Sequence, residues 1–322
     1  MSDPRPEDQQ PGTPAATSVE PALEEKSYSQ GQLVRRRFFH HKGAIIAVVI
    51  LALITLVAFT SIGFGPIPGW WGKSFSTTGA VLDGGRPTIS WTGLGEHPFG
   101  QDTTGRDYFA LVMRGTQISL TIAFIVGIVS TIIGTIIGAI AGYFRGWVET
   151  LLMRMTDLFI IIPLLVLAAV LGQIASGGGI VVLALVLALV TWTSLARLVR
   201  GEVLSLRERE FVSAARAIGT GPWRIIFRHI LPNTVGVIIV STTFAIASAI
   251  LLETALSYLG FGVQAPDVSL GSLISQYQTA FTTRPWLFWF PGIFILAIAL
   301  CVNFIGDGLR DAFDPRQKKD GA

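Results

Sequence analysis

Few residues in this sequence have the types and spacing that catalysis or the binding of a nucleotide, metal or cofactor requires. Residues 72–74, Gly-Lys-Ser, match the end of a phosphate-binding loop, but Ile67 stands where that loop needs a glycine five positions earlier. The single cysteine, Cys301, lies in an apolar run, which favours a buried small side chain and leaves no partner for an intrachain disulfide. We therefore expect no catalytic group, no nucleotide site, no metal site and no cofactor.

The ionisable residues beside or within apolar runs have structural interpretations as well as functional ones. His40 and His41 border the first apolar run, where anchoring at the membrane interface is favoured over metal binding. Asp157 lies one helical turn after Arg154, a spacing that predicts a local ion pair. Glu253 lies at the end of an apolar run, where an ionisable side chain is costly, so it has either a structural role or a place on a substrate path.

The elements that must position these residues are helices in lipid. Of the 322 residues, 51% are hydrophobic and 14% are charged, and the mean hydropathy of +0.59 is too high for a soluble domain. Runs long enough to cross about 30 Å of hydrocarbon occupy residues 43–62, 118–142, 151–172, 179–199, 233–254 and 287–306. We predict an all-α, polytopic membrane protein with six transmembrane helices, and nothing in the composition implies nucleic-acid binding.

The basic residues fix an orientation for this bundle. Most of them fall in segments on the side of the N-terminus, and the opposite side holds only Lys73, Arg86, Arg106, Arg114 and Arg284. The positive-inside rule therefore predicts that both termini are cytoplasmic. Residues 1–34, rich in Pro, Glu, Ser and Gln, are expected to be a disordered cytoplasmic tail. Residues 35–322 are then the transmembrane domain, with an extracytoplasmic loop over 63–115 and a cytoplasmic loop over 200–232.

Two features of the apolar runs predict how the helices pack and bend. Gly134, Gly138 and Gly142 recur every four residues, which places three notches on one helical face where a neighbouring backbone can approach. Pro163 interrupts the run 151–172 and frees a backbone carbonyl, so a bend is expected there. The bend is either structural or part of a gate.

The loop over 200–232 contains two amphipathic pieces. In the first piece, apolar residues recur at i, i+3, i+4 and i+7, at Phe211, Ala214, Ala215 and Ile218. The second piece repeats this spacing at Trp223, Ile226, Phe227 and Ile230. Between them, Gly219 can end the first helix in a left-handed conformation and Pro222 can begin the second. We predict a helical hairpin across the cytoplasmic membrane face.

Physical chemistry alone leaves three roles open for this hairpin. It could lie on anionic lipid, it could serve only to orient the protein, or it could be a docking site for another protein. The motif favours docking, because the segment resembles the loop shared by permeases of binding-protein-dependent ABC importers. That motif reads Glu-Ala-Ala, then Gly four residues later, then Ile-x-Leu-Pro or a variant about ten residues on.

The match to that motif can be followed residue by residue. Ala214, Ala215, Gly219 and Pro232 occupy motif positions, whereas Ser213 replaces the glutamate and removes its charge from that position. The resemblance implies that the residues coupling the chain to an ATPase are Glu210, Ser213, Ala214, Ala215, Arg216, Gly219, Pro222, Ile230 and Pro232. Apart from the resemblance, the position of Glu253 and the bend at Pro163 make these two residues candidates for the pathway or a gate.

Three further segments are similar to one branch of these permeases, which transports dipeptides, oligopeptides or nickel. They are residues 97–107, His-Pro-Phe-Gly-Gln-Asp-Thr-Thr-Gly-Arg-Asp, together with residues 253–262 and 306–315. The resemblance implies a type I ABC importer permease in a bacterial cell membrane, with peptide as the first candidate cargo and nickel or another small solute as the alternative. The implied partners are a second homologous permease, two ATP-binding subunits, an extracytoplasmic substrate-binding protein and the lipid bilayer.

Other classes of membrane protein have patterns that this sequence lacks. A secondary transporter would need inverted repeats or broken helices that carry ion-coordinating groups at mid-membrane. A channel would need a repeated selectivity motif, and an intramembrane enzyme would need paired catalytic groups within its spans. The spans here are almost purely aliphatic.

Overall fold

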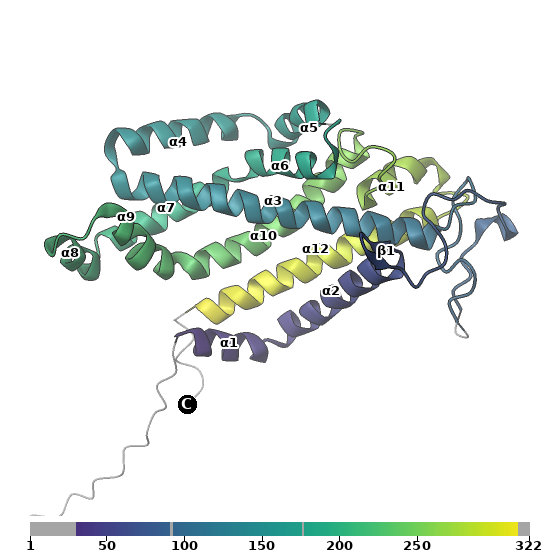
Figure 1. Ribbon diagram of the computed structural model, residues 1–322, viewed down its shortest axis with the longest axis horizontal. Helices are drawn as coiled ribbons and strands as arrows, with labels where there is room; N and C mark the ends of the chain where they lie inside the picture. The colour runs from purple at the N-terminus through teal and green to yellow at the C-terminus, as the bar shows by residue number, and fades with distance from the viewer. Residues whose placement is uncertain (1–29, 91–92, 176, 315–322) are drawn as a thin grey trace, which may run out of the picture.

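The computed structural model describes residues 30–90, 93–175 and 177–314, and these residues form a long helical bundle (Figure 1). The helices are α1 (Gln30–His40), α2 (Lys42–Ser61), α3 (Tyr108–Phe144), α4 (Gly146–Ile161), α5 (Leu164–Ala175), α6 (Gly179–Thr191), α7 (Thr193–Arg207), α8 (Glu210–Ala217), α9 (Pro222–Ile225), α10 (Leu231–Tyr258), α11 (Leu270–Tyr277) and α12 (Trp286–Phe313). Short elements complete the chain: β1 (Gly63–Phe64) and β2 (Ile67–Pro68), which pair antiparallel, the single turns η1 (Asp83–Gly85) and η3 (Gln278–Ala280), and a π-helical turn η2 (Ile226–Ile230).

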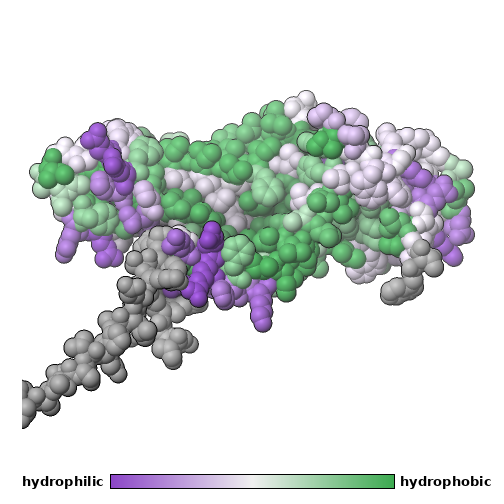
Figure 2. Space-filling model, turned by 60° about the horizontal axis from the view of Figure 1, so that its bottom comes forward, coloured by the Kyte–Doolittle hydropathy of each residue, from purple (hydrophilic) through white to green (hydrophobic). Residues whose placement is uncertain are grey.

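The long helices have the length and composition to cross a membrane. Four unbroken helices meet these criteria, namely α2, α3, the rod Pro222–Tyr258 and α12. If each of the bent pairs α4–α5 and α6–α7 counts as one span, the number of candidate spans is 6. Figure 2 shows hydrophobic side chains over much of the middle of one face, with hydrophilic groups toward either end. The chain is therefore an all-α protein that crosses the membrane several times.

The packing of α3 against α7 confirms the close approach predicted from the glycines. A Cβ atom on Gly138 would lie 2.5 Å from the Ala196 carbonyl oxygen, and one on Gly134 would lie 2.9 Å from that of Trp192. Gly142 meets Val203 in the same way, at 2.8 Å. Glycine is required at these positions because any larger residue would push the two backbones apart.

The bends in the two broken spans have different origins. The bend predicted at Pro163 is confirmed, and it is large, because α4 and α5 meet at 89°. Ile162 has the extended backbone that a residue before proline prefers. The 46° bend between α6 and α7 falls at Trp192, without proline or glycine. Trp192 is buried and its ring centre lies 5.7 Å from that of Phe159 in α4, so the second bend coincides with tertiary packing of this residue.

Several helices extend beyond the runs predicted from hydropathy. Helix α1 begins at Gln30, so the last residues of the segment 1–34, expected to be disordered, are helical, and residues 1–29 lie outside the described part of the chain. Helix α3 begins at Tyr108 rather than near 118, because the Asp107 carboxylate caps it by accepting from the Ala110 amide at 3.0 Å. The loop expected over 63–115 therefore ends at Asp107.

Candidate functional site

The predicted hairpin is present and lies at one end of the bundle (Figure 1). Helix α8 ends at Ala217, and Gly219, two residues later, has the predicted positive φ of 79°. The Gly219 amide donates to Arg216 at 2.9 Å and the Thr220 amide donates to Ala215 at 3.0 Å, which together form a Schellman motif. Pro222 occupies the first turn of α9, where its missing N–H costs nothing.

One side of this hairpin is buried against the bundle. Val212, Ala215, Ile225, Ile226 and Ile230 are at most 5% exposed. They form one hydrophobic cluster with Ala139 of α3 and with Leu195, Val199 and Val203 of α7. The hairpin is therefore seated directly on α3 and α7.

Four large apolar side chains of the hairpin are exposed. Phe211 is 42% exposed, Ile218 83%, Trp223 53% and Phe227 63%. We call these four residues the exposed apolar patch. The amphipathic spacing had grouped Phe211, Ala214, Ala215 and Ile218 on one face, but of these only Ala215 is buried. The periodicity alone did not identify the buried face, because α8 packs on the bundle through Val212 and Ala215, and Phe211, Ala214 and Ile218 stay exposed.

The remaining motif residues fall on both sides of the hairpin. Glu210, Ser213, Ala214 and Arg216 of α8 are exposed, and the Arg216 guanidinium lies 5.4 Å from the centre of the Tyr143 ring. Ile230 is fully buried. The motif therefore contains both buried positions, which seat the hairpin on the bundle, and exposed positions, which do not.

The second half of the hairpin does not lie across the membrane face as predicted. Helix α9 continues through η2 into α10, so that Pro222–Tyr258 forms one rod. The π-helical turn has a local cause in Pro232, which has no N–H to donate and whose ring would clash with the carbonyl four residues earlier. The Leu231 amide bonds instead to Ile226, and the Asn233 side chain donates to the His229 carbonyl at 2.6 Å.

At the other end of the bundle lie residues 63–90 and 93–107, here called the outer loop after the location predicted from the sequence, and charged residues hold them in place. The Asp102 carboxylate is fully buried and accepts from Arg106 Nε at 2.6 Å and from the Tyr277 hydroxyl of α11 at 2.8 Å. The Arg284 guanidinium donates to the Asp102 carbonyl at 2.8 Å. These contacts join the outer loop to α11 and to the start of α12.

The Asp102 cluster also sets the protonation of its members. Burial of the Asp102 carboxylate disfavours its charge, but hydrogen bonds from Arg106, Tyr277 and Thr104 outweigh that effect and lower its pKa below the ordinary value. Burial, and then the nearby Asp102 charge, raise the pKa of Tyr277. Asp102 is therefore ionised and Tyr277 is a hydrogen-bond donor throughout the neutral pH range.

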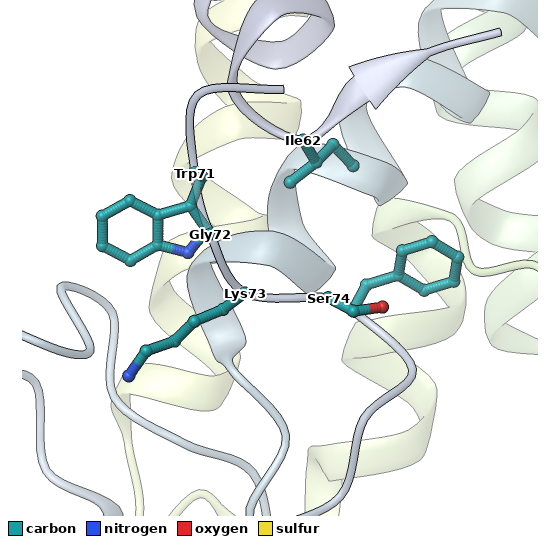
Figure 3. A pocket seen from close by; sticks show the side chains of 6 residues that line it. Ile62, Trp71, Gly72, Lys73 and Ser74 are labelled. Carbon is teal, nitrogen blue, oxygen red and sulfur yellow. The ribbon is translucent and has the colours of Figure 1, made fainter. Parts of the chain in front are cut away.

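A second polar chain surrounds the segment that matched the phosphate-binding loop. Lys73 Nζ lies 3.1 Å from Glu96 Oε1 and 3.0 Å from His97 Nε2. His97 Nδ1 lies 2.7 Å from Asp107 Oδ1. Figure 3 shows Lys73 and Trp71 on one side of the segment and Ile62 on the other, around a cavity of about 280 Å³. The Lys73 ammonium is thus engaged by the outer loop, and the segment does not form a phosphate cradle.

The structure places Glu253 inside the bundle. Its carboxylate is fully buried and accepts from Ser119 at 2.9 Å and from Ser257 at 2.7 Å. It therefore joins α3 to α10 and does not line a described cavity. Asp157 lies 3.9 Å from Arg154, as the spacing predicts, but its shorter contact is to Arg197 of α7 at 2.5 Å.

Three residues that hold the segment 97–107 in place are not identifiable from the sequence. Tyr277, Arg284 and Trp71, whose indole donates to Asp107 at 2.8 Å, lie far from residues 97–107 in the chain. The only available signal was the density of polar residues in 97–107 itself, which indicates an ordered loop without naming its partners.

Comparisons with known proteins agree with this architecture. Residues 134–319 match the family described as binding-protein-dependent transport system inner membrane component. Residues 29–68 match the family described as N-terminal TM domain of oligopeptide transport permease C. A chain of the MetNI methionine ABC transporter, solved in inward-facing conformations, superposes with a TM-score of 0.53 and 18% identity, covering 63% of this chain and 96% of that one.

Curated relatives cover nearly the whole chain. The oligopeptide transport system permease protein OppC of Mycobacterium tuberculosis H37Rv is 37% identical over 291 residues, covering 90% of this chain and 96% of the relative. OppC of Escherichia coli K12 is 37% identical, covering 92% and 94%, and a putative peptide permease protein of Brucella ovis is 38% identical, covering 89% and 92%. The chain therefore belongs to the family of inner membrane components of binding-protein-dependent transport systems.

Proposed function

We propose that this chain is a permease subunit of an ATP-driven importer of peptides in a bacterial cell membrane. The observation that carries the proposal is the extent of similarity to OppC of Mycobacterium tuberculosis, 37% identity over 90% of the chain. The names of these relatives mention peptides, and none of these names mentions nickel, the alternative cargo. The chain itself performs no catalysis in this proposal, and ATP hydrolysis belongs to partner subunits.

The partners follow from what one chain can supply. A single bundle with a single hairpin provides half of a central pathway, so a second homologous permease completes it. Two ATP-binding subunits act on the two hairpins, and an extracytoplasmic binding protein delivers the peptide. Both termini and the hairpin lie in the cytoplasm, and the outer loop faces the binding protein. The distribution of basic residues supports this orientation.

The exposed apolar patch is the surface that meets the ATP-binding subunit. Four large apolar side chains on two adjoining helices are costly in water, and aromatic residues of this kind anchor protein interfaces. Because the other side of the hairpin packs on α7, movement of the ATP-binding subunit is passed to the spans. The Schellman turn at Gly219 fixes the angle at which the patch is presented.

The test removes one anchor from the patch. Phe227→Ser should weaken assembly with the ATP-binding subunits, which co-purification from the complete transporter and substrate-stimulated ATP hydrolysis would measure. Phe39→Ser on α1 is the matched control, because Phe39 is a 66% exposed aromatic residue outside the hairpin. Equal assembly and equal stimulation in both variants would remove the patch from the proposal.

The cargo is tested on the partner that selects it. Binding measurements with the extracytoplasmic binding protein of the same system should show retention of short peptides rather than nickel chelates. Reconstitution adds a second test: the complete transporter should import those peptides, and this chain alone in vesicles should not. Import by the chain alone would indicate a secondary transporter.

A further inference from the structure

A second cavity lies where the outer loop meets α11. It has a volume of about 440 Å³, within the range of about 300–1,000 Å³ for small-molecule sites. Phe75, Ser76 and Arg106 of the outer loop form one wall. The end of α10, the connection between α10 and α11, and α11 itself form the rest, through Ser257, Gly260, residues 263–268, Ser272, Ser275 and Gln276.

The walls of this cavity offer hydrogen bonds in both directions. The Gln276 side chain both donates and accepts, and the Gln264 side-chain oxygen accepts. The Ser272 and Ser275 hydroxyls already donate to the Ser269 and Tyr258 carbonyls, and so act as further acceptors. The Gln276 side chain is exposed, and it makes no hydrogen bond to another residue within the described ranges. Phe75, Val263, Pro266 and Val268 add apolar surface between these groups. This mixture of amide groups and apolar surface suits a ligand that itself carries amides and apolar side chains.

The charges in the cavity are balanced. Arg106 pairs with Asp102 at 2.6 Å, and Asp267 pairs with Arg114 at 2.7 Å. Arg106 Nη1 and Asp267 Oδ2 make no hydrogen bond to the part of the chain that the structure describes. The cavity therefore keeps one cationic donor and one anionic acceptor, with no net charge, which complements a zwitterion.

This chemistry disfavours a metal ion, a small anion and a purely apolar ligand. No group of three His, Cys, Asp or Glu residues among the described positions could hold a metal ion. A small anion would be repelled by Asp267 and by the Asp102 carboxylate beside Arg106, and a purely apolar ligand would leave the amides and hydroxyls unpaired. A short peptide supplies backbone donors and acceptors, a carboxylate for the guanidinium and an ammonium for the carboxylate.

We propose that this cavity is a binding site for the transported peptide at the outer mouth of the permease. The inference rests on the proposed function, and it adds a site on this chain to a system whose selectivity would otherwise belong to the binding protein alone. The contacts among Asp102, Arg106 and Tyr277 hold the two walls of the cavity together, so the outer loop contributes to the binding of the peptide.

Photo-crosslinking tests the occupant directly. A photoreactive phenylalanine analogue is placed at Gln276 in the complete transporter, which is then given its binding protein loaded with a tritiated mixture of short peptides. We expect radiolabel on this chain after irradiation. The matched control is the same analogue at Thr279, which is exposed two residues beyond α11 and does not line the cavity, and we expect little label there.

Filling the cavity gives a second readout. Gln276→Trp should lower the number of peptides imported per ATP hydrolysed, whereas Thr279→Trp should leave that ratio unchanged. The melting temperature of each assembled variant checks folding.

Each alternative result has a distinct meaning. If the unaltered transporter imports peptides but Gln276 captures none and Gln276→Trp imports normally, the site is wrong and the proposed function stands. Crosslinking to the binding protein in place of peptide assigns the cavity to that partner and overturns the inference. If the unaltered transporter imports no peptide, the proposed function fails and the site fails with it.

Discussion

At the scale of single residues, Gly219 decides how the hairpin turns. Its φ of 79° lies in the left-handed region, where a side chain costs about 1–2 kcal/mol. Gly219→Val should therefore misalign α9 relative to α8 and lower substrate-stimulated ATP hydrolysis by the complete transporter, while membrane insertion is kept because the buried cluster is intact.

Gly221 supplies the matched control for that substitution. Its φ of −67° and ψ of 155° suit any residue, and a Cβ atom there meets nothing within 4 Å. Gly221→Val should leave stimulation near that of the unaltered transporter. If both variants behave alike, the turn conformation is not what couples the hairpin to its partner.

Asp102 is the residue on which the outer loop depends. Replacing it by asparagine leaves Arg106 without its buried counter-charge, and a hydrogen bond to a charged group is worth about 1.5–3 kcal/mol. Asp102→Asn should increase amide hydrogen exchange across residues 97–107 and lower the melting temperature. Asp83→Asn, at an exposed acid of the same loop, is the control.

The pH dependence of this loop follows from the same residue. Because the pKa of Asp102 is lowered in the folded loop, its stabilising contribution is complete above the ordinary carboxyl pKa. That contribution is lost as the pH falls through the lower, folded-state pKa. Protection of residues 97–107 from exchange should thus be unchanged from neutral to mildly acidic pH, and a loss already near pH 6 would contradict the assignment.

At the scale of elements, the contact between α3 and α7 depends on backbone proximity. Adding one methyl group at Gly138 places an atom 2.5 Å from the Ala196 carbonyl, and overpacking of this kind costs about 1–3 kcal/mol. Gly138→Ala should lower the melting temperature of the purified protein in detergent. Gly292→Ala in α12 is the control, since a Cβ atom there meets nothing within 4 Å, and equal melting temperatures would refute the close packing.

At the scale of the whole molecule, the hairpin and the outer loop lie at opposite ends of the bundle (Figure 1). In a chain with Cys301 replaced by serine, a cysteine at Thr220 should react with an impermeant thiol reagent only from the cytoplasm. A cysteine at Ser76 should react only from outside. Labelling in intact cells and in inverted vesicles would measure this, and the reverse pattern would overturn the proposed orientation.

Local patterns in the sequence determined which segments cross the membrane, where they bend at proline, and which glycines receive a neighbouring backbone. Length, hydropathy and steric demands of this kind are properties of residues close together in the chain. The turn at Gly219 and Pro222 was predictable for the same reason, because its conformation depends on two residues with special backbone preferences.

Only the tertiary structure decided which residues come together from distant parts of the chain. The bend at Trp192, the burial of Val212 in place of Phe211 and Ile218, and the seating of Glu253 between Ser119 and Ser257 all depend on packing partners. The cluster of Asp102, Arg106 and Tyr277 joins residues more than 170 positions apart. The sequence shows whether a side chain is apolar or charged, but the fold decides which neighbours bury it or pair with it.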